Sequence, residues 1–407
     1  MRLMVIGAGG VGAAFARIVR RRDFFERLVL ADLDLAVARR AADAADDPRV
    51  TAIALDASSS DDVAAAIEAG GITAVLNLVD PRFVRPIFES CLAVGVTYVD
   101  LAMSMSRPHP TEPFVRTGLK LGEKQFLLSA SWERRGALAL VGMGNSPGLT
   151  DVFARYAADH LFDEVHEVGV RRGGDLVVHG HEFAPTSSMW SMVEQCLNPP
   201  VIWERGRGWY TTEPFSGPEF FTFPEGIGPR RCVNAEHEEV MLIPRWVDCR
   251  RVTFKHGISE ELLDVLATVR KLGLDSVEPV EVRGGVVAPR DVLTASLPDP
   301  ATLTGNIEGH TCVGTWVSGV GHHGEDKEVF LYHVAENAAT VGRDGVQAVL
   351  WQAALFASVA LELLASGVWS GSGVRGAESF DPVPFLDLVK DGHDAAWGME
   401  LRRGDAA

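Results

Sequence analysis

Cysteine is sparse in this sequence, and no two cysteines lie close together. The 407 residues include 5 cysteines, an odd number with no C-x-x-C pair. This spacing argues against a disulfide framework and against a zinc site. It fits a reducing compartment, so we expect a cytoplasmic protein.

Positive charge is also scarce. Lys and Arg number 38 against 55 Asp and Glu, which gives a formal net charge of −17. No block of five or six basic residues occurs, and the densest cluster is the three arginines at 20–22. Because nucleic acids and anionic membranes are bound through a positive face, we expect neither as a partner.

Long uninterrupted apolar runs are missing as well. Residues 346–364 come nearest, but they carry Gln347, Gln352 and Glu362 and lie between two glycines. We interpret this segment as a buried amphipathic helix rather than a membrane span. With 47% hydrophobic and 23% charged residues, the chain is typical of a soluble globular protein, and its length predicts two domains.

The first residues, MRLMVIGAGGVGAAFA, have the composition of a short signal peptide, but their glycines have a better use. A predicted strand at 2–6 is followed at once by Gly7-Ala-Gly9-Gly10-Val-Gly12, the spacing G-x-G-x-x-G, and then by a predicted helix at 13–21. In a dinucleotide loop Gly7 makes the tight turn, Gly9 admits the pyrophosphate and Gly12 lets helix and strand pack closely. The helix N-terminus then meets the phosphates.

Alternating strands and helices continue to about residue 101. We predict strands at 50–55, 74–79 and 97–101, and helices at 61–69 and 82–94. This alternation predicts a parallel, doubly wound Rossmann sheet, in which ligands lie beyond the carboxyl ends of the strands. The predicted cofactor-binding residues fall at those ends: Gly7, Gly9, Gly10, Val11, Gly12, Asp32, Leu33, Asp56, Asn77, Leu78, Val79 and Ala102.

The end of the second strand bears on the choice of cofactor. Asp32 can accept hydrogen bonds from the adenosine ribose, and Leu33 and Asp34 stand where an NADP enzyme usually has an arginine. We therefore expect NAD, with NADP less favoured; Arg39 or Arg40 folding back would be the exception. A methyltransferase also uses a glycine turn and an acid after the second strand, but the full glycine motif at residue 7 and the large second domain count against it.

The second half changes character after the turn at 145–148. A helix is predicted at 149–160 and another at 259–271, among short alternating runs at 165–171, 175–183, 251–256, 280–285, 312–320 and 328–336. We expect a mixed α+β domain and then one long helix at 342–366 that returns to the first domain. The predicted boundaries are 1–150 for the Rossmann domain, 151–340 for the substrate and dimerisation domain, and 341–407 for the returning segment.

The chain resembles the saccharopine dehydrogenase-like family, which includes saccharopine reductases, lysine 6-dehydrogenases and carboxynorspermidine synthases. The motifs that carry the resemblance are VIGAGGVG (5–12), TYVDLA (97–102), GMGNSPGLTD (142–151), EHEEVMLIPR (236–245), LPDPATL (297–303), VQAVLWQAAL (346–355) and GVRGAESFDPVPFLDLV (373–389). The stretch 179–210 does not clearly follow any one member.

The resemblance implies an NAD(P)-dependent oxidoreductase that transfers hydride at a carbon–nitrogen bond of an amino-acid- or diamine-derived substrate, and a homodimer formed through the second domain. Such a site needs a proton-handling group near the amine and cations for substrate carboxylates. The proton-handling candidates are Asp100 first, then His237 and Glu238. The alternative for the EHEE run is a solvated acidic loop, and for Asp100 a helix cap.

The substrate-binding candidates are His181, Arg172, Arg231, Arg245 and Trp190, because guanidinium groups grip carboxylates and aromatic rings wall a substrate chain. Surface charge and core packing are the alternatives for each. We expect no metal: His179 with His181, and His322 with His323, lack a third ligand at suitable spacing. A non-enzymatic dinucleotide-binding regulator with the same fold is the alternative function.

Overall fold

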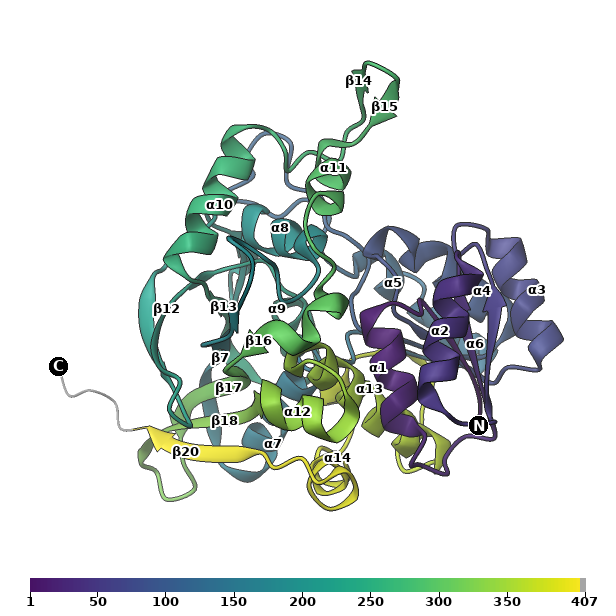
Figure 1. The fold of residues 1–407 in the computed structure, drawn as a ribbon. Coiled ribbons are helices and arrows are strands. Elements are labelled where there is room, and N and C mark those ends of the chain that lie inside the picture. The colour runs from purple at the N-terminus through teal and green to yellow at the C-terminus, as the bar shows by residue number, and fades with distance from the viewer. Residues whose placement is uncertain (403–407) are drawn as a thin grey trace.

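The computed structural model describes residues 1–402 and divides them between two sheets (Figure 1). The first is a seven-stranded parallel sheet in the order β19-β6-β5-β4-β1-β2-β3. Its members are β1 (Arg2–Ile6), β2 (Arg27–Asp32), β3 (Val50–Ala54), β4 (Ala74–Asn77), β5 (Thr97–Asp100), β6 (Leu138–Leu140) and β19 (Gly373–Arg375). The predicted Rossmann sheet is confirmed, with two further strands.

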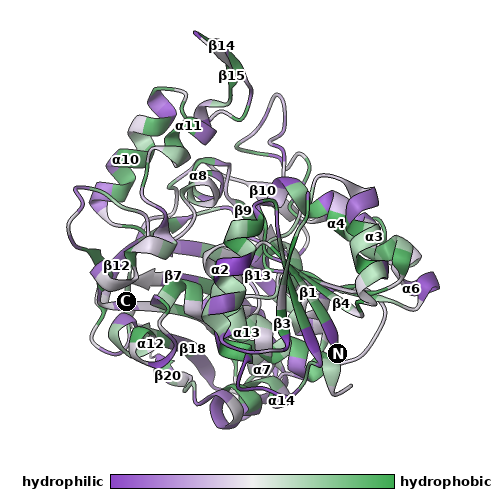
Figure 2. Ribbon diagram, turned by 45° about the vertical axis from the view of Figure 1, so that its right-hand side comes forward, coloured by the Kyte–Doolittle hydropathy of each residue, from purple (hydrophilic) through white to green (hydrophobic). Residues whose placement is uncertain are grey.

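Helices cover this sheet as the alternation predicts. They are α1 (Gly10–Val19), α2 (Leu35–Ala45), α3 (Ser60–Gly70), α4 (Val84–Val94), α5 (Glu123–Phe126) and α6 (Ser129–Arg135), with a short 3₁₀ turn η1 (Pro81–Phe83). Helix α1 packs against α2 and against α13 from the far end of the chain, whereas α3 packs against α4. The central strands β1, β2 and β4 are mainly apolar and buried between their ends because helices cover both faces of the sheet (Figure 2).

The second sheet is mixed and nine-stranded. Its main path is β10-β9-β13-β7-β17-β18-β20, and the β11–β12 hairpin joins it through β13. The strands are β7 (Glu164–Gly174), β9 (Val201–Glu204), β10 (Gly208–Thr211), β11 (Glu219–Phe223), β12 (Gly228–Asn234), β13 (Cys249–Gly257), β17 (His310–Val320), β18 (Asp326–Glu336) and β20 (Gly398–Arg402). Strands β7 and β13 run parallel, whereas the other pairs are antiparallel.

Helices α7 (Leu149–His160) and α9 (Glu239–Trp246) pack on this sheet. A satellite cluster above it holds α8 (Met189–Leu197), α10 (Glu260–Lys271) and α11 (Pro289–Ala295), and a hairpin of β14 (Val280–Val282) and β15 (Gly285–Val287) projects beyond them (Figure 1). Strands β8 (Val177–Val178) and β16 (Ile307–Glu308), the 3₁₀ segment η2 (Pro300–Asn306) and, near the end, η3 (Ala377–Ser379), α14 (Val383–Asp387) and η4 (Leu388–Gly392) complete the elements.

Two predictions of local structure are wrong, and one alternative is excluded. The run 175–183 forms only the two-residue strand β8, because it continues as an exposed loop. The long helix at 342–366 is two helices, α12 (Asn337–Asp344) and α13 (Ala348–Ala365), since Gly345 is left-handed (φ 66°) and ends the first. The EHEE run is not a solvated loop, because all four side chains are buried.

The returning segment connects both sheets. Helix α13 packs against α1, and β19 adds an edge strand to the Rossmann sheet, whereas β20 pairs with β18 of the second sheet. By length and composition α13 would also suffice to cross a membrane, but 72% of that stretch is buried within the protein. It is packed like the core helix of a globular domain.

Candidate active site

A cavity of about 520 Å³ opens at the glycine loop, between the two domains. The first domain contributes Gly9 to Gly12 and Leu78; the second contributes residues from 185–189 and 294–301, and α13 contributes Leu350. Segments of the second domain and α13 therefore form the opposite wall of the predicted dinucleotide site. The glycine motif alone does not indicate these segments.

The glycines of the loop have the spacing that a bound pyrophosphate requires. A Cβ on Gly12 would lie 2.1 Å from the Gly7 carbonyl oxygen, and one on Gly7 (φ 102°) would lie 2.9 Å from the Leu78 backbone. At Gly9 a Cβ would meet nothing within 4 Å, so this backbone faces open space. Gly7 and Gly12 thus build the loop, and Gly9 keeps room for a ligand. The residues present fit a dinucleotide.

Asp32 holds the loop from the second strand. Its carboxylate accepts hydrogen bonds from the backbone N–H of Ala8 at 2.9 Å and of Asp34 at 3.1 Å. Leu33 beside it is 75% exposed. The Asp34 carboxylate accepts from the Ala36 N–H and caps α2, so two carboxylates lie just beyond the end of β2. Asp56 is exposed and accepts hydrogen bonds from the backbone and hydroxyl of Ser58. It therefore stabilises the turn that precedes α3.

A buried chain of hydrogen bonds joins the next two strand ends. Asn77 donates to the Tyr98 hydroxyl at 3.0 Å, and Tyr98 donates to Asp100 at 2.9 Å. Asp100 also accepts from the Gln125 amide at 2.8 Å and from the Gly142 N–H at 2.7 Å. Burial raises the pKa of Asp100 to about 7. Its oxygens are thus engaged in tying β5 to the loops that begin at 103 and 142.

A second buried cluster gathers candidates from distant parts of the chain. His237 is fully buried, stacks on Phe254 with ring centroids 4.0 Å apart, and hydrogen-bonds Glu239 through Nδ1. Glu239 in turn accepts from the hydroxyls of Ser146 at 2.5 Å and Thr150 at 2.9 Å. The ring is therefore fixed in place, and its Nε2 has no hydrogen-bond partner within residues 1–402.

The charges in this cluster act on one another. Burial opposes protonation of His237, but the carboxylates of Glu239 and Glu238 outweigh it and raise its pKa. The carboxylate of Glu238 lies 3.3 Å from His237 Nδ1, and burial raises the pKa of Glu238. The neighbouring acids thus favour the protonated form of His237, and burial favours the protonated form of Glu238.

Arg172 of β7 approaches the same cluster. Burial lowers its pKa, whereas the charges of Glu239 and Glu238 act to raise it. In the part of the chain that the structure describes, its guanidinium makes no hydrogen bond and no ion pair, unlike that of its neighbour Arg171, which pairs with Glu219. An arginine held near buried acids without a partner of its own is available to a ligand anion.

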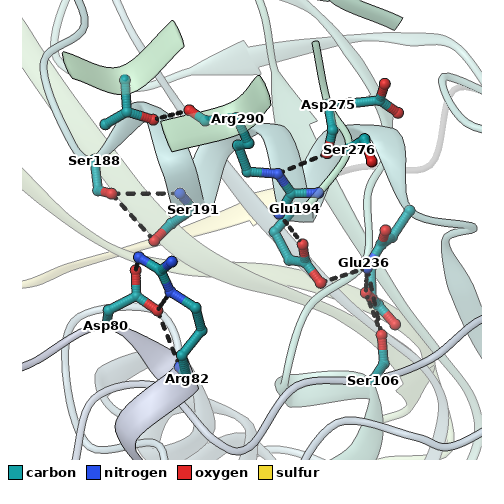
Figure 3. Close-up of polar contacts among 12 residues, drawn as sticks. Asp80, Arg82, Ser106, Ser188, Ser191, Glu194, Glu236, Asp275, Ser276 and Arg290 are labelled. Atoms are coloured by element: carbon teal, nitrogen blue, oxygen red, sulfur yellow. Dashed lines mark hydrogen bonds and ion pairs between the residues drawn. The ribbon is translucent and has the colours of Figure 1, made fainter. Parts of the chain in front are cut away.

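A small cavity of about 40 Å³ lies beside the cluster. Glu238, Glu236 and Glu194 line it, together with Ala102 and Trp190. The Trp190 ring lies between the guanidinium groups of Arg82 and Arg290, at 4.9 and 4.7 Å. Arg82 belongs to the first domain and also pairs with Asp291 of the second at 3.2 Å, so these contacts join the two domains (Figure 3 shows Arg82 and Arg290).

Glu238 lies beside His237 and lines one cavity with Trp190, and the charge of Glu238 acts on Arg172. The remaining substrate-binding candidates lie elsewhere. Arg231 pairs with the exposed Glu260, and Arg245 stacks over Phe126 at 3.8 Å and donates to the Met241 carbonyl. His181 is exposed and lines a separate cavity of about 520 Å³. Roles for these three stay predictions.

Several groups at the site were missed by sequence reasoning. They are the buried acids Glu236, Glu239, Asp151 and Glu378, the half-buried Glu194, and the polar side chains Tyr98, Ser106, Gln125 and Asn198. Asp151 ends one motif that carries the family resemblance and Glu378 lies within another, which was the only available signal. From the sequence alone, an acid at the start of a helix is interpreted as a solvent-exposed helix cap, because the sequence does not show that it is buried.

His237, Glu238 and Glu239 offer three ligand atoms within 4.8 Å of one another, a spacing that suits a metal ion. Glu239, however, already accepts from two hydroxyls, and the Arg172 cation acts on the same acids. The absence of a metal stays a prediction.

Comparison with known proteins decides the family. The saccharopine dehydrogenase NADP binding domain model matches residues 3–140, and the saccharopine dehydrogenase C-terminal domain model matches residues 144–393. The chain belongs to the saccharopine dehydrogenase family. It is a nicotinamide-nucleotide-dependent oxidoreductase, and the alternative of a non-enzymatic regulator finds no support.

Relatives extend over nearly the whole chain. It is 28% identical to carboxyaminopropylagmatine dehydrogenase of Synechocystis sp., covering 95% of this chain and 94% of that one. It is also 28% identical to carboxynorspermidine synthase of Vibrio alginolyticus, covering 96% and 94%. The solved saccharopine dehydrogenase (L-Glu forming) of Saccharomyces cerevisiae shares the fold, with a TM-score of 0.71, 13% identity, and coverage of 99% of this chain and 100% of that one.

Proposed function

We propose that this member of the saccharopine dehydrogenase family interconverts a secondary amine with an amino-acid aldehyde and a free amine, through the imine. The observation that carries the proposal is that Glu238, which lies 3.3 Å from the buried His237, lines a cavity together with Ala102, just after β5 of the Rossmann sheet. The charges of Glu238 and Glu239 also act on Arg172. The names of the two curated relatives, which concern carboxylated polyamine derivatives, support this substrate class.

Arg172 binds the carboxylate of the substrate. Its guanidinium lies near the acids that handle the proton, and it has no partner of its own within residues 1–402. A carboxylate held by two parallel N–H···O bonds fixes the position of the adjacent carbon, so the carbon–nitrogen bond is held in one orientation at the cofactor.

Glu238 handles the proton at the substrate nitrogen, because it lines the cavity. A bound nicotinamide would supply the acceptor or donor of the hydride at the carbon of that bond. As the carbon–nitrogen bond of the amine is oxidised, the nitrogen loses its proton to Glu238; in the reductive direction Glu238 returns it. His237, held by Glu239 and Phe254, positions Glu238 from 3.3 Å and balances its charge. This geometry favours Glu238 over Asp100, whose oxygens are engaged.

We further propose that NAD serves better than NADP. The description of the matching family model names NADP, but here Asp32 and Asp34 would face a 2′-phosphate and repel it. Arg39 and Arg40 are exposed on α2, with neither in an ion pair among the described residues.

Enzyme activity tests the proposal directly. Absorbance of the reduced cofactor is followed with lysine, with saccharopine, and with diamines plus aspartate semialdehyde. We expect turnover with at least one amine, and its absence across the panel would contradict the proposal.

Arg172→Gln is expected to raise KM for the carboxylate-bearing substrate roughly 10- to 100-fold, the effect of a lost charged hydrogen bond. The matched control is Arg250→Gln, because Arg250 lies on the neighbouring strand and pairs with the exposed Glu164. Equal KM values in both variants would remove Arg172 from the site.

A homodimer through the second domain is part of the same proposal. Phe220 on β11 and Leu401 on β20 are 79% and 71% exposed, so the second sheet leaves apolar side chains to cover. The expected mass in light scattering at micromolar concentration is that of two chains, and a monomer mass would contradict the proposal.

A further inference from the structure

Two sulfur atoms lie side by side on helix α8. Met192 and Cys196 are four residues apart, so their side chains share one face of the helix. The Cys196 Sγ lies 3.6 Å from the Met192 Sδ. Cys196 is fully buried, whereas Met192 is half-buried. A thiol and a thioether in contact form a pair of soft donors, the kind that selects Cu(I) over harder ions.

His256, near the end of β13, adds a nitrogen atom to the sulfur pair. Its Nδ1 lies 4.0 Å from the Cys196 Sγ. The residue is 7% exposed, and within residues 1–402 its ring forms no ion pair and no hydrogen bond with a nitrogen or oxygen atom. Burial, together with the charges of Arg172 and His237, lowers the pKa of His256. The ring is therefore neutral, and it keeps a lone pair that a ligand can use.

Packing alone explains the two sulfur atoms but not the imidazole ring. Met192 and Cys196 belong to the apolar satellite cluster around α8 and α10, where sulfur contacts are ordinary. A polar ring that is buried without a hydrogen-bonding partner costs free energy, and an apolar side chain at position 256 would avoid that cost. The ring has a use if its nitrogen binds something that comes from outside the chain.

The separations of the three atoms suit coordination of one metal ion. With bonds of about 2.0 Å to nitrogen and about 2.3 Å to sulfur, the ligands of a three- or four-coordinate ion lie roughly 3.5–4.0 Å apart. The two separations at Cys196, 3.6 and 4.0 Å, fall in this range. None of the three donors is an oxygen atom, so the set does not suit Mg²⁺ or Ca²⁺.

An open cavity leads to the sulfur pair. It has a volume of about 520 Å³ and is lined by Met192, by Met189 one turn earlier on α8, and by the exposed His181. An ion can therefore reach Met192 from solvent, along a wall that carries a second thioether and a second imidazole. This cavity is distinct from the one beside Glu238.

We propose that Cys196, Met192 and His256 bind one thiophilic monovalent ion of the Cu(I) class, which clamps α8 to β13. Burial raises the pKa of the Cys196 thiol to about 12, so the thiol keeps its proton until an ion arrives. On binding, the S–H bond breaks, the proton leaves to solvent, and the sulfur atom bonds to the ion without transfer of an electron. The ion takes no part in the proposed hydride transfer, so the expectation of a metal-free reaction is unaffected.

Arg172 favours a monovalent over a divalent ion. It is the register partner of His256 on the neighbouring strand β7, and its charge acts on Cys196. A thiolate and a monovalent ion sum to zero charge, whereas a divalent ion would leave a net positive charge beside the guanidinium. Helix α8 also carries Trp190, which lines the cavity beside Glu238, so the clamp fixes one wall of the candidate active site.

Chelator competition measures the site without substrate or cofactor. Under reducing, oxygen-free conditions, the full chain competes for Cu(I) with a chelator whose colour reports its copper complex. We expect the wild type to withdraw a single equivalent, and Cys196→Ser to lower the affinity more than about 100-fold, beyond the usual cost of losing an outer partner of a metal. The matched control is Cys249→Ser, because Cys249 is also buried but its thiol has no sulfur or imidazole contact in the described chain. Equal affinity in Cys196→Ser and the wild type would overturn the proposal.

Met192→Leu tests the ligand set with little change of volume, so the proposal stays testable if Cys196→Ser does not fold. We expect the affinity for Cu(I) to fall roughly 10- to 100-fold, whereas Met399→Leu, on the exposed part of β20, leaves it unchanged. An unchanged affinity in Met192→Leu would overturn the assignment.

Thermal melts with Ag(I), an ion of the same class that is not readily oxidised, give a second readout. Because the ion binds the folded chain, Ag(I) should raise the melting temperature of the wild type, and it should raise that of Cys196→Ser less. A larger rise with Zn(II) than with Ag(I), or equal rises in the two proteins, would overturn the proposal. Neither measurement uses an amine, so failure of the proposed reaction would leave this assignment intact.

Discussion

Tyr98 donates a hydrogen bond to Asp100 across 2.9 Å, and neither side chain has any exposed surface. The pair stands at the end of β5, between Asn77 on one side and the loop at Gly142 on the other. This relationship makes Asp100 an acceptor for groups of the protein itself.

Asp100→Asn is therefore expected to cost about 1–3 kcal/mol of folding free energy, because the new amide must face one of the donors Gln125, Tyr98 and Gly142. Chemical denaturation measures it. Tyr98→Phe, which removes one donor, should cost less. If Asp100 instead handles the proton, Asp100→Asn would keep its stability and lose about two to four orders of magnitude in turnover.

Two glycines of the nucleotide loop should respond differently to alanine. Gly9→Ala is expected to fold normally, because the added Cβ meets nothing within 4 Å, and to weaken cofactor binding, because the methyl group occupies the approach of the pyrophosphate. Gly12→Ala would place its Cβ 2.1 Å from the Gly7 carbonyl oxygen, so it should lower the melting temperature. Thermal melts and fluorescence titration with the reduced cofactor separate the two effects. An equal cofactor Kd for Gly9→Ala and the wild type would contradict the approach of the pyrophosphate to Gly9.

The double variant Asp32→Ser, Leu33→Arg should shift cofactor preference towards NADP. It removes one carboxylate and adds a cation at a position that is 75% exposed. The measurement is kcat/KM with each cofactor in both proteins. If the wild type already prefers NADP, the NAD prediction is wrong, and Arg39 or Arg40 is the expected partner of the 2′-phosphate.

Glu378 gives a stability prediction with a defined sign. It is fully buried, both of its oxygens lack a partner within residues 1–402, and burial raises its pKa to about 8. The folded state thus binds a proton that the unfolded state releases near its ordinary pKa of roughly 4.5. Stability is therefore greatest below that value and is lost as the pH rises through about 8.

Glu378→Gln should match the wild type in melting temperature at about pH 4, below the unfolded-state pKa, and exceed it at pH 9, because glutamine cannot ionise. Differential scanning calorimetry at the two pH values tests this. A wild type whose melting temperature does not fall relative to the variant would show that Glu378 is not the buried acid that limits stability at high pH.

The Rossmann domain could be predicted from the sequence because its signals are local. The glycine loop, Asp32 and the alternation of strands and helices all lie within the first hundred residues. Strands β6 and β19 were missed because each has three residues and pairs only across long sequence separation. The break between α12 and α13 depends on one left-handed glycine.

The site was predictable only where a motif marked it. His237 and Glu238 were noticed in the EHEE run. The charge of Glu238 acting on Arg172, and the cavity that Glu238 shares with Trp190, depend on which segments of the chain meet in space. Helix α8 contributes Trp190 and Glu194 from the segment 179–210, where the resemblance to known members is weakest. The part of the site that faces the substrate is thus the part that family motifs describe least.

Strand β19 pairs with β6, although about 230 residues separate them in the chain. A ribosome adds roughly 5–20 residues each second, so the Rossmann sheet waits on the order of tens of seconds for its last strand. Until then the edge of β6 is open to pairing with other chains. A chain truncated anywhere before residue 373 would leave the edge of β6 permanently unpaired. Slow or interrupted synthesis is therefore expected to yield aggregates rather than an isolated nucleotide-binding domain.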